Sequence, residues 1–167
     1  MRIGITGTPG TGKSTSLKLV DTELDKIYLT EWCNEHYSKS GIEIEVDTDV
    51  LNTEFKKKNN FIVEGHLAHF IELDKLVILR CNPDVLRDRL AKRGYSKKKI
   101  MDNIESEALD LILIESLQMH DKSSIYEIDV TQMIIEDLAK YIESVINNNA
   151  LPQFGRIDWS DVILGWY

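Results

Sequence analysis

Short apolar runs alternate with stretches of helical periodicity along this chain. The runs rich in β-branched residues have the length of buried strands, and they lie at Arg2–Thr6, Lys26–Thr30, Ile42–Val46, Phe61–Gly65, Lys75–Cys81 and Ser124–Thr131. Apolar residues at helical spacing predict helices at 14–24, 48–58, 82–94, 96–119 and from the last run to about 147, with a weak helical signal at 31–41. Strands that alternate with helices favour an α/β fold, in which helices cover both faces of a parallel sheet.

The composition indicates a single cytoplasmic domain. The chain has 167 residues, 43% of them hydrophobic, which is enough for one sizeable core. Asp and Glu (28) outnumber Lys and Arg (20), and the net charge of −8 gives no general attraction to bare nucleic acid or to an anionic membrane. Cys33 and Cys81 lack the spacing of a disulfide framework or a zinc site, and no stretch approaches the ~18 apolar residues of a membrane span.

The most specific signal is the segment GTPGTGKST at Gly7–Thr15, which follows the first strand candidate and opens a helix. The pattern GxxxxGK followed by Ser is satisfied by Gly7, Gly12, Lys13 and Ser14. In such a turn small residues let successive backbone N–H groups point at phosphate oxygens. Lys13 then reaches the outer phosphates and the Ser14 hydroxyl coordinates Mg²⁺, so the segment predicts a site for ATP and Mg²⁺.

A second candidate group ends the strand in FIVEGHLAHF. Glu64 at the carboxyl tip of the strand has the position of a Walker B carboxylate that holds Mg²⁺ or its water. His66 lies just beyond, where an imidazole could accept a proton from an attacking oxygen. The alternative is that His66 and His69 only cap the strand end or line the surface.

A third candidate group is RDRLAKRGYSKKK. Arg89 and Arg93 are four residues apart and share a helix face next to the turn at Gly94–Ser96. Both could fold onto the transferring phosphoryl group and stabilise its developing charge. A solvated helix face is the other interpretation, and it fits the neighbouring lysines, Lys92 and Lys97 to Lys99, better than the arginines.

These motifs together carry a resemblance. GITGTPGTGKST, VEGHLAH, the segment from LRCNPDVLRDRLAKRGYSKKKI to NIESEALDLILIES, and the tail GRIDWSDV resemble the atypical adenylate kinases of archaea and eukaryotes. That family includes the coilin-interacting nuclear ATPase, adenylate kinase isoenzyme six. The resemblance implies a P-loop kinase fold in one domain over 1–167, in which helices flank a parallel five-stranded sheet. It also implies an AMP-binding region at about 28–58, a lid at about 93–104 and a tail at 150–167.

The resemblance further implies adenylate kinase and ATPase activity, and a role in small-ribosomal-subunit maturation through a small-subunit ribosomal protein. It implies Arg93 as a lid contact, Glu64 as the Walker B residue and His66 as the water-positioning residue. The nucleotide contacts that it implies are Gly10, Thr11, Gly12, Lys13, Ser14 and Thr15.

Two departures from related kinases concern the acceptor and the metal. Many nucleoside monophosphate kinases hold the acceptor phosphate with an arginine after this strand, but this chain has no arginine between Arg2 and Arg80. Lys39 or the run Lys56–Lys58 could substitute as weaker point charges. Many relatives also have Asp where Glu64 stands. The function therefore stays open between an AMP kinase, a kinase for another small nucleotide, and an ATP-driven assembly switch that binds a ribosomal protein.

The C-terminal tail is unusually aromatic. Trp159, Trp166 and Tyr167 lie within its last nine residues. We expect the tail to pack on the body of its own chain, and the alternative is that it docks a partner or a second copy.

Overall fold

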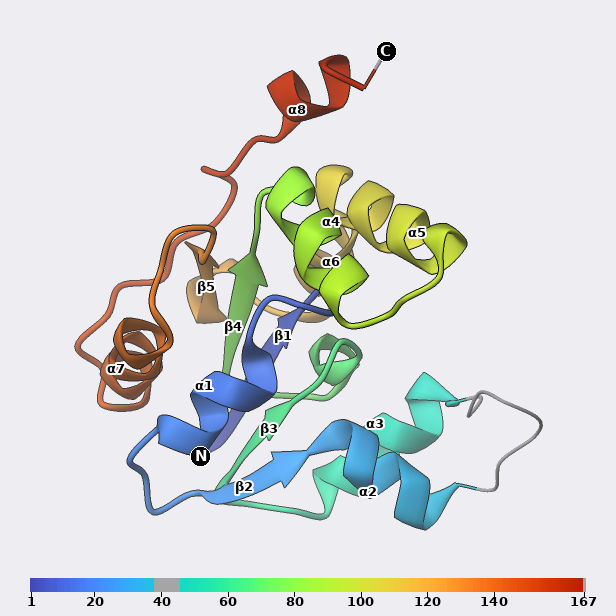
Figure 1. Cartoon of the computed structure of the whole chain (residues 1–167). Coiled ribbons are helices and arrows are strands. Elements are labelled where there is room, and N and C mark those ends of the chain that lie inside the picture. The colour runs from blue at the N-terminus through green and yellow to red at the C-terminus, as the bar shows by residue number, and fades with distance from the viewer. Residues whose placement is uncertain (38–45, 167) are drawn as a thin grey trace.

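The computed structural model describes residues 1–37 and 46–166 (Figure 1). One parallel sheet has the order β2-β3-β1-β4-β5, with β1 at Arg2–Gly7, β2 at Asp25–Tyr28, β3 at Phe61–Glu64, β4 at Lys75–Arg80 and β5 at Ile125–Asp129. This confirms the predicted five-stranded α/β fold. Because β1 lies between β3 and β4, the loops that follow these three strands meet at one edge of the sheet.

Helices cover both faces of the sheet. They are α1 (Lys13–Leu19), α2 (Leu29–His36), α3 (Thr48–Lys56), α4 (Pro83–Lys92), α5 (Lys97–Ala108), α6 (Leu111–Met119), α7 (Ile135–Ile146) and α8 (Ser160–Leu164), with two short 3-10 helices, η1 (Ala68–Phe70) and η2 (Lys122–Ser124). The side chains of β4 alternate between two cores. Val77 and Leu79 pack with residues of α1, α4, α5 and α7, whereas Leu76 and Ile78 pack with residues of α2, α3 and α6.

Some predicted boundaries are wrong. The single helix expected at 96–119 is divided into α5 and α6, because Asp110 adopts a left-handed conformation (φ 55°) and its carboxylate pairs with the Arg80 guanidinium. The helix expected at 14–24 ends at Leu19, since Val20 has an extended backbone (ψ 125°). Of the strand candidate Ile42–Val46, only Val46 is among the described residues, and it lies outside any strand.

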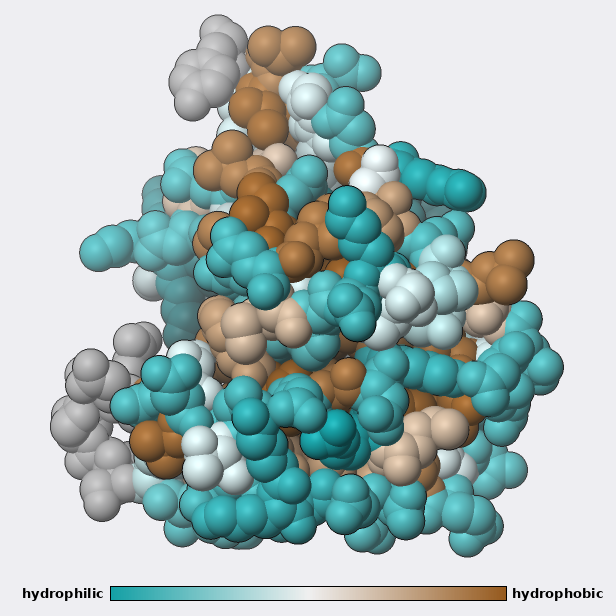
Figure 2. Space-filling view, turned by 180° about the vertical axis from the view of Figure 1, so that it is seen from behind, coloured by the Kyte–Doolittle hydropathy of each residue, from teal (hydrophilic) through white to brown (hydrophobic). Residues whose placement is uncertain are grey.

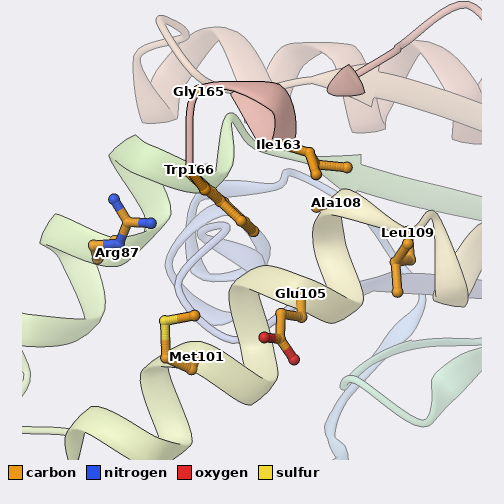
Figure 3. Close-up of a pocket in the computed structure, with 8 residues that line it drawn as sticks. All are labelled: Arg87, Met101, Glu105, Ala108, Leu109, Ile163, Gly165 and Trp166. Atoms are coloured by element: carbon orange, nitrogen blue, oxygen red, sulfur yellow. The ribbon is translucent and has the colours of Figure 1, made fainter. Parts of the chain in front are cut away.

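The tail packs on its own chain through its tryptophans. Trp159 is 9% exposed and its indole N–H donates to Glu107 Oε1 at 3.3 Å. Trp166 donates to Asp84 Oδ1 at 3.2 Å, and its ring lies 5.3 Å from the guanidinium carbon of Arg87. Between α4, α5 and α8 the side chains leave a cavity of about 590 Å³ (Figure 3).

The surface near this cavity is partly apolar. Seen from behind, apolar side chains gather toward the upper part of the molecule, the part where α8 lies (Figure 2). Exposed apolar residues here include Met101 of α5, Leu109 just after α5, and Leu164 of α8. Within residues 1–37 and 46–166, no helix combines the length and the apolar character needed to cross a membrane.

Candidate active site

The glycine-rich loop joins β1 to α1 at the carboxyl edge of the sheet. Gly10 and Gly12 have φ angles of 95° and 98°, in the left-handed region that favours glycine. A Cβ atom at Gly10 would lie 2.8 Å from Leu86 Cδ1, so the loop also approaches α4 too closely for a side chain. Both glycines therefore allow the path of the loop, and Gly10 also allows its close packing on α4.

Lys13 lies directly behind this loop. Its ammonium donates to the carbonyl oxygens of Gly7 at 2.7 Å and Thr8 at 3.1 Å, and the residue is 9% exposed. Burial lowers the pKa of Lys13 to about 8, against the attraction of the Glu64 carboxylate, and the positive charge of Arg93 lowers it further. The side chain is still protonated at pH 7, so it brings a positive charge to the loop.

Glu64 and Ser14 meet beside Lys13. Glu64 ends β3 and pairs in register with Ile5 of β1, and its carboxylate accepts a hydrogen bond from Ser14 Oγ at 2.9 Å. Burial raises the pKa of Glu64, while the hydrogen bond from Ser14 and the charge of Lys13 oppose the rise. Sequence reasoning expected this pair as metal ligands, and the structure brings the two side chains together.

The Ser14–Glu64 pair has the chemistry that Mg²⁺ requires. Mg²⁺ prefers oxygen ligands, and in phosphate-binding sites the protein usually supplies only one or two of them. Among the residues that the structure describes, no group of three or more His, Cys, Asp or Glu side chains could hold a metal ion by itself. The donors present therefore fit a metal that binds together with a phosphate ligand.

The two candidate histidines have different environments. His66 is exposed at the surface, but neighbouring protein atoms keep part of the solvent away from its ring. This desolvation lowers the pKa of His66, and the positive charge of Lys13 lowers it further, so the imidazole is neutral at pH 7. His69 is 1% exposed and its ring contacts Thr6 Oγ1 at 3.2 Å and Glu115 Oε2 at 2.9 Å. His69 is thus a buried residue that connects β1 with α6, so the expectation that it lines the surface is wrong.

The two candidate arginines lie around the loop. Arg89 of α4 donates to the carbonyl oxygens of Gly10 at 3.4 Å and Thr131 at 3.2 Å, so its guanidinium touches the phosphate-binding loop itself. Arg93 follows the last turn of α4 and is exposed, and its charge acts on Lys13 as described above. Arg89 therefore contacts the loop directly, whereas Arg93 acts on Lys13 through its positive charge.

Of the lysines considered for the acceptor, Lys56 and Lys57 form surface ion pairs and Lys58 is exposed. Lys56 pairs with Glu72 at 3.2 Å, both exposed, and Lys57 pairs with the partly exposed Glu54 at 2.6 Å. Lys39 lies outside the residues that the structure describes.

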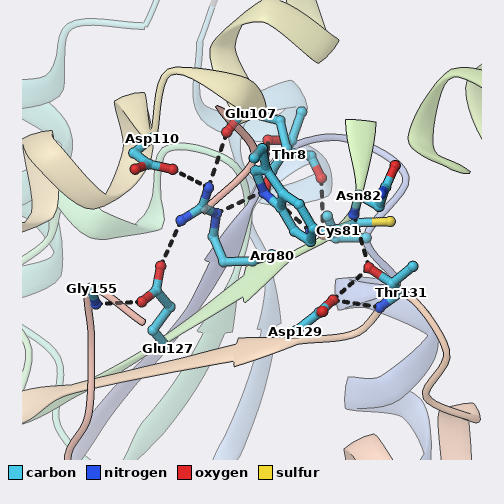
Figure 4. Close-up of polar contacts among 12 residues, drawn as sticks. Thr8, Arg80, Cys81, Asn82, Glu107, Asp110, Glu127, Asp129, Thr131 and Gly155 are labelled. Carbon is cyan, nitrogen blue, oxygen red and sulfur yellow. Dashed lines mark hydrogen bonds and ion pairs between the residues drawn. The ribbon is translucent and has the colours of Figure 1, made fainter. Parts of the chain in front are cut away.

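A buried ionic network next to the loop was not predicted (Figure 4). Arg80, at the end of β4, is 2% exposed and pairs with Glu107 at 2.7 Å and Glu127 at 2.6 Å, and also with Asp110. Glu107 Oε2 in turn accepts a hydrogen bond from Thr8 Oγ1 at 2.6 Å. A signal existed in the sequence, because Arg80 continues the apolar run LVIL and a charge in a buried strand requires a partner.

The sheet, its flanking helices and the loop define a P-loop kinase fold. Two solved structures have the same fold: shikimate kinase from Bacteroides thetaiotaomicron, with a TM-score of 0.56 and 21% identity, covers 88% of this chain and 98% of its own. A gluconokinase from Sinorhizobium meliloti has a TM-score of 0.55 and 14% identity, over 88% of this chain and 91% of its own. At these identities the likeness concerns the fold alone.

Comparison of sequences identifies the family. The family model described as "AAA domain" matches residues 3–110. The chain is 39% identical to a Natronomonas pharaonis protein named "Putative adenylate kinase", over 96% of this chain and 99% of that protein. A protein of the same name from Archaeoglobus fulgidus is 38% identical over 95% of this chain and 92% of its own. The chain belongs to this adenylate-kinase-like family and is a nucleoside monophosphate kinase-like enzyme.

Proposed function

We propose that this enzyme transfers the γ-phosphoryl group of ATP to AMP and forms two molecules of ADP. The observation that carries the proposal is the hydrogen bond between Ser14 and Glu64 beside the Lys13 ammonium, because a metal-binding pair and a phosphate-binding cation then share one edge of the sheet. The names of the archaeal relatives support AMP as the acceptor. The motifs quoted above support membership in the atypical type of adenylate kinase isoenzyme six.

The donor nucleotide would be held by the loop and by α1. Backbone N–H groups of residues 10–15, including those of Thr11 and Thr15, would bind the phosphates, and the Lys13 ammonium would move from the carbonyls of Gly7 and Thr8 to the outer phosphates. Ser14 and Glu64 would hold Mg²⁺, which supplies neutralisation of phosphate charge when bound.

Arg89 and Arg93 would stabilise the charge that develops during transfer. Arg89 already contacts the loop at Gly10, and Arg93 begins the proposed lid at about 93–104, which comprises the turn before α5 and most of that helix. Closure of this lid would exclude water, so that AMP rather than water receives the phosphoryl group.

The acceptor region would be the segment at about 28–58, with α2 and α3. Since the chain has no arginine between Arg2 and Arg80, the acceptor phosphate lacks a bidentate partner from this segment. We therefore expect weak AMP binding and a substantial rate of ATP hydrolysis. The neutral imidazole of His66 would accept the proton of the attacking water in that reaction.

The missing arginine also favours a second candidate function. In that case the chain is an ATP-driven switch that binds a small-subunit ribosomal protein during ribosome assembly and releases it when ATP is hydrolysed. The resemblance to adenylate kinase isoenzyme six implies this function. A kinase for another small nucleotide is the third alternative.

A coupled assay of ADP formation with and without AMP tests the proposal. We expect AMP to increase the rate well above that of hydrolysis, and Glu64→Gln to abolish most of this increase. Glu72→Gln, an exposed glutamate in a surface ion pair, is the matched control and should behave as the wild type. A rate that AMP does not raise would refute the kinase activity, and a rate unchanged by a ribosomal-protein partner would refute the switch.

A further inference from the structure

The buried carboxylate of Glu107 connects four separate parts of the fold. Its Oε1 accepts hydrogen bonds from Arg80 Nε at 2.7 Å, from the Cys81 N–H at 3.1 Å and from the Trp159 indole at 3.3 Å. Its Oε2 accepts the hydroxyl of Thr8 at 2.6 Å. Glu107 therefore joins the end of β4, the tail and the phosphate-binding loop to α5, the helix on which it lies (Figure 4).

Thr8 is the residue through which this carboxylate reaches the loop. It directly follows β1, it is 2% exposed, and its hydroxyl donates to Glu107. Its carbonyl oxygen accepts hydrogen bonds from Lys13 Nζ at 3.1 Å and from Thr11 Oγ1 at 2.9 Å. The orientation of Thr8 thus affects both the lysine and the inner side of the loop.

Arg80 supplies the positive charge beside the buried carboxylate of Glu107. Arg80 donates to two buried carboxylates, of which Glu127 is also held by the backbone N–H of Gly155 at 2.6 Å. Glu107 is 3% exposed and forms an ion pair with Arg80, and charge-assisted hydrogen bonds are stronger than those between neutral groups. The contact at Thr8 is therefore a strong and directional one.

We propose that Glu107 is a positioning residue, which through Thr8 fixes the phosphate-binding loop in the conformation that receives the phosphates of ATP. This inference rests on the proposed function. It adds a residue of α5, outside the loop, to the groups that determine how the donor nucleotide binds. Glu107 itself does not touch the nucleotide in this proposal.

Thr8→Val tests the proposal, because it removes the hydroxyl but keeps the shape of the side chain and the Arg80–Glu107 pair. We expect the KM for ATP to rise about tenfold while the KM for AMP stays unchanged, since only the donor loop loses a restraint. Thr8→Ser keeps the hydroxyl and should restore the wild-type KM for ATP. Thr22→Val is the matched control, because its hydroxyl accepts the Leu24 N–H within the connection between α1 and β2.

Hydrogen exchange of the loop gives a readout that does not depend on catalysis. Thr8→Val should accelerate amide exchange in residues 7–15 in the absence of nucleotide, whereas Thr8→Ser should not. Glu107→Gln should give the same acceleration, and Glu105→Gln, an exposed neighbour on α5, should not. Wild-type exchange in the loop of Thr8→Val, or equal rises of both KM values, would overturn the role of Glu107. Absence of Mg²⁺-ATP binding to the wild type would instead refute the proposed function itself.

Discussion

Replacing Lys13 with methionine should stabilise the ligand-free protein while it strongly weakens nucleotide binding. Met has nearly the volume of the lysine stem but carries no charge. The pKa of Lys13 is lowered from its ordinary value of 10.5 to about 8, because burial penalises its charged form. Each pKa unit corresponds to about 1.4 kcal/mol, so the buried charge costs the folded state about 3 kcal/mol at neutral pH.

Part of this gain is lost again with the hydrogen bonds of the ammonium. The Thr8 carbonyl keeps its partner Thr11, whereas the Gly7 carbonyl loses the contact from Lys13, at a cost of about 1 kcal/mol. The net stabilisation of Lys13→Met is therefore about 2 kcal/mol, which corresponds to a rise in Tm of about 4–8 °C for a chain of this size. Lys18→Met, at an exposed lysine of the same helix, should change Tm by far less.

Thermal unfolding at several pH values checks the reasoning. Between pH 8 and 10.5 the unfolded chain binds more protons at this residue than the folded chain, so the stability of the wild type should rise with pH relative to Lys13→Met. The difference in Tm between the two proteins should accordingly shrink above pH 8. ATP binding by Lys13→Met, measured by calorimetry, should fall at least 100-fold. A Tm of Lys13→Met below that of Lys18→Met would refute the argument.

Three further predictions follow from the same contacts. Burial raises the pKa of Glu64, so protons should compete with Mg²⁺ for its carboxylate at a higher pH than at an ordinary glutamate. The Mg²⁺ concentration for half-maximal ADP formation should therefore increase as the pH falls from about 7 to 5. Glu64→Gln should lose this pH dependence. His66→Ala should lower the rate of ATP hydrolysis about 100-fold with a much smaller change in the Kd for ATP, and equal losses in both would mean that His66 is structural. Arg80→Met should destabilise the fold by about 3–5 kcal/mol in urea unfolding, because Glu107 and Glu127 are left buried without their cation, whereas Arg87→Met, at a half-exposed ion pair, should cost about 1 kcal/mol or less.

The sheet and the loop were predictable because local sequence determines them. The run RIGIT before a glycine-rich turn specifies a buried strand that ends at a phosphate-binding loop, and Glu64 falls at the tip of the next apolar run, so a parallel sheet brings it beside Ser14. Glu64 reaches Ser14 because β3 lies next to β1, as the observed strand order shows.

The division between α5 and α6 could not be predicted from periodicity, since apolar residues continue at helical spacing from Ile104 through Ala108 to Leu111 and Ile112. The break depends on Asp110, whose left-handed backbone is compensated by the ion pair with Arg80, 30 residues away in sequence. The same arginine holds Glu107, which lies on the stripe that otherwise reads as the apolar face of the helix. A buried cation thus determines both where α5 ends and which of its residues reaches Thr8. Arg80→Met should therefore accelerate amide exchange in the phosphate-binding loop as well as destabilise the fold. A folded Arg80→Met protein with wild-type amide exchange in residues 7–15 would show that Arg80 does not control the loop through Glu107.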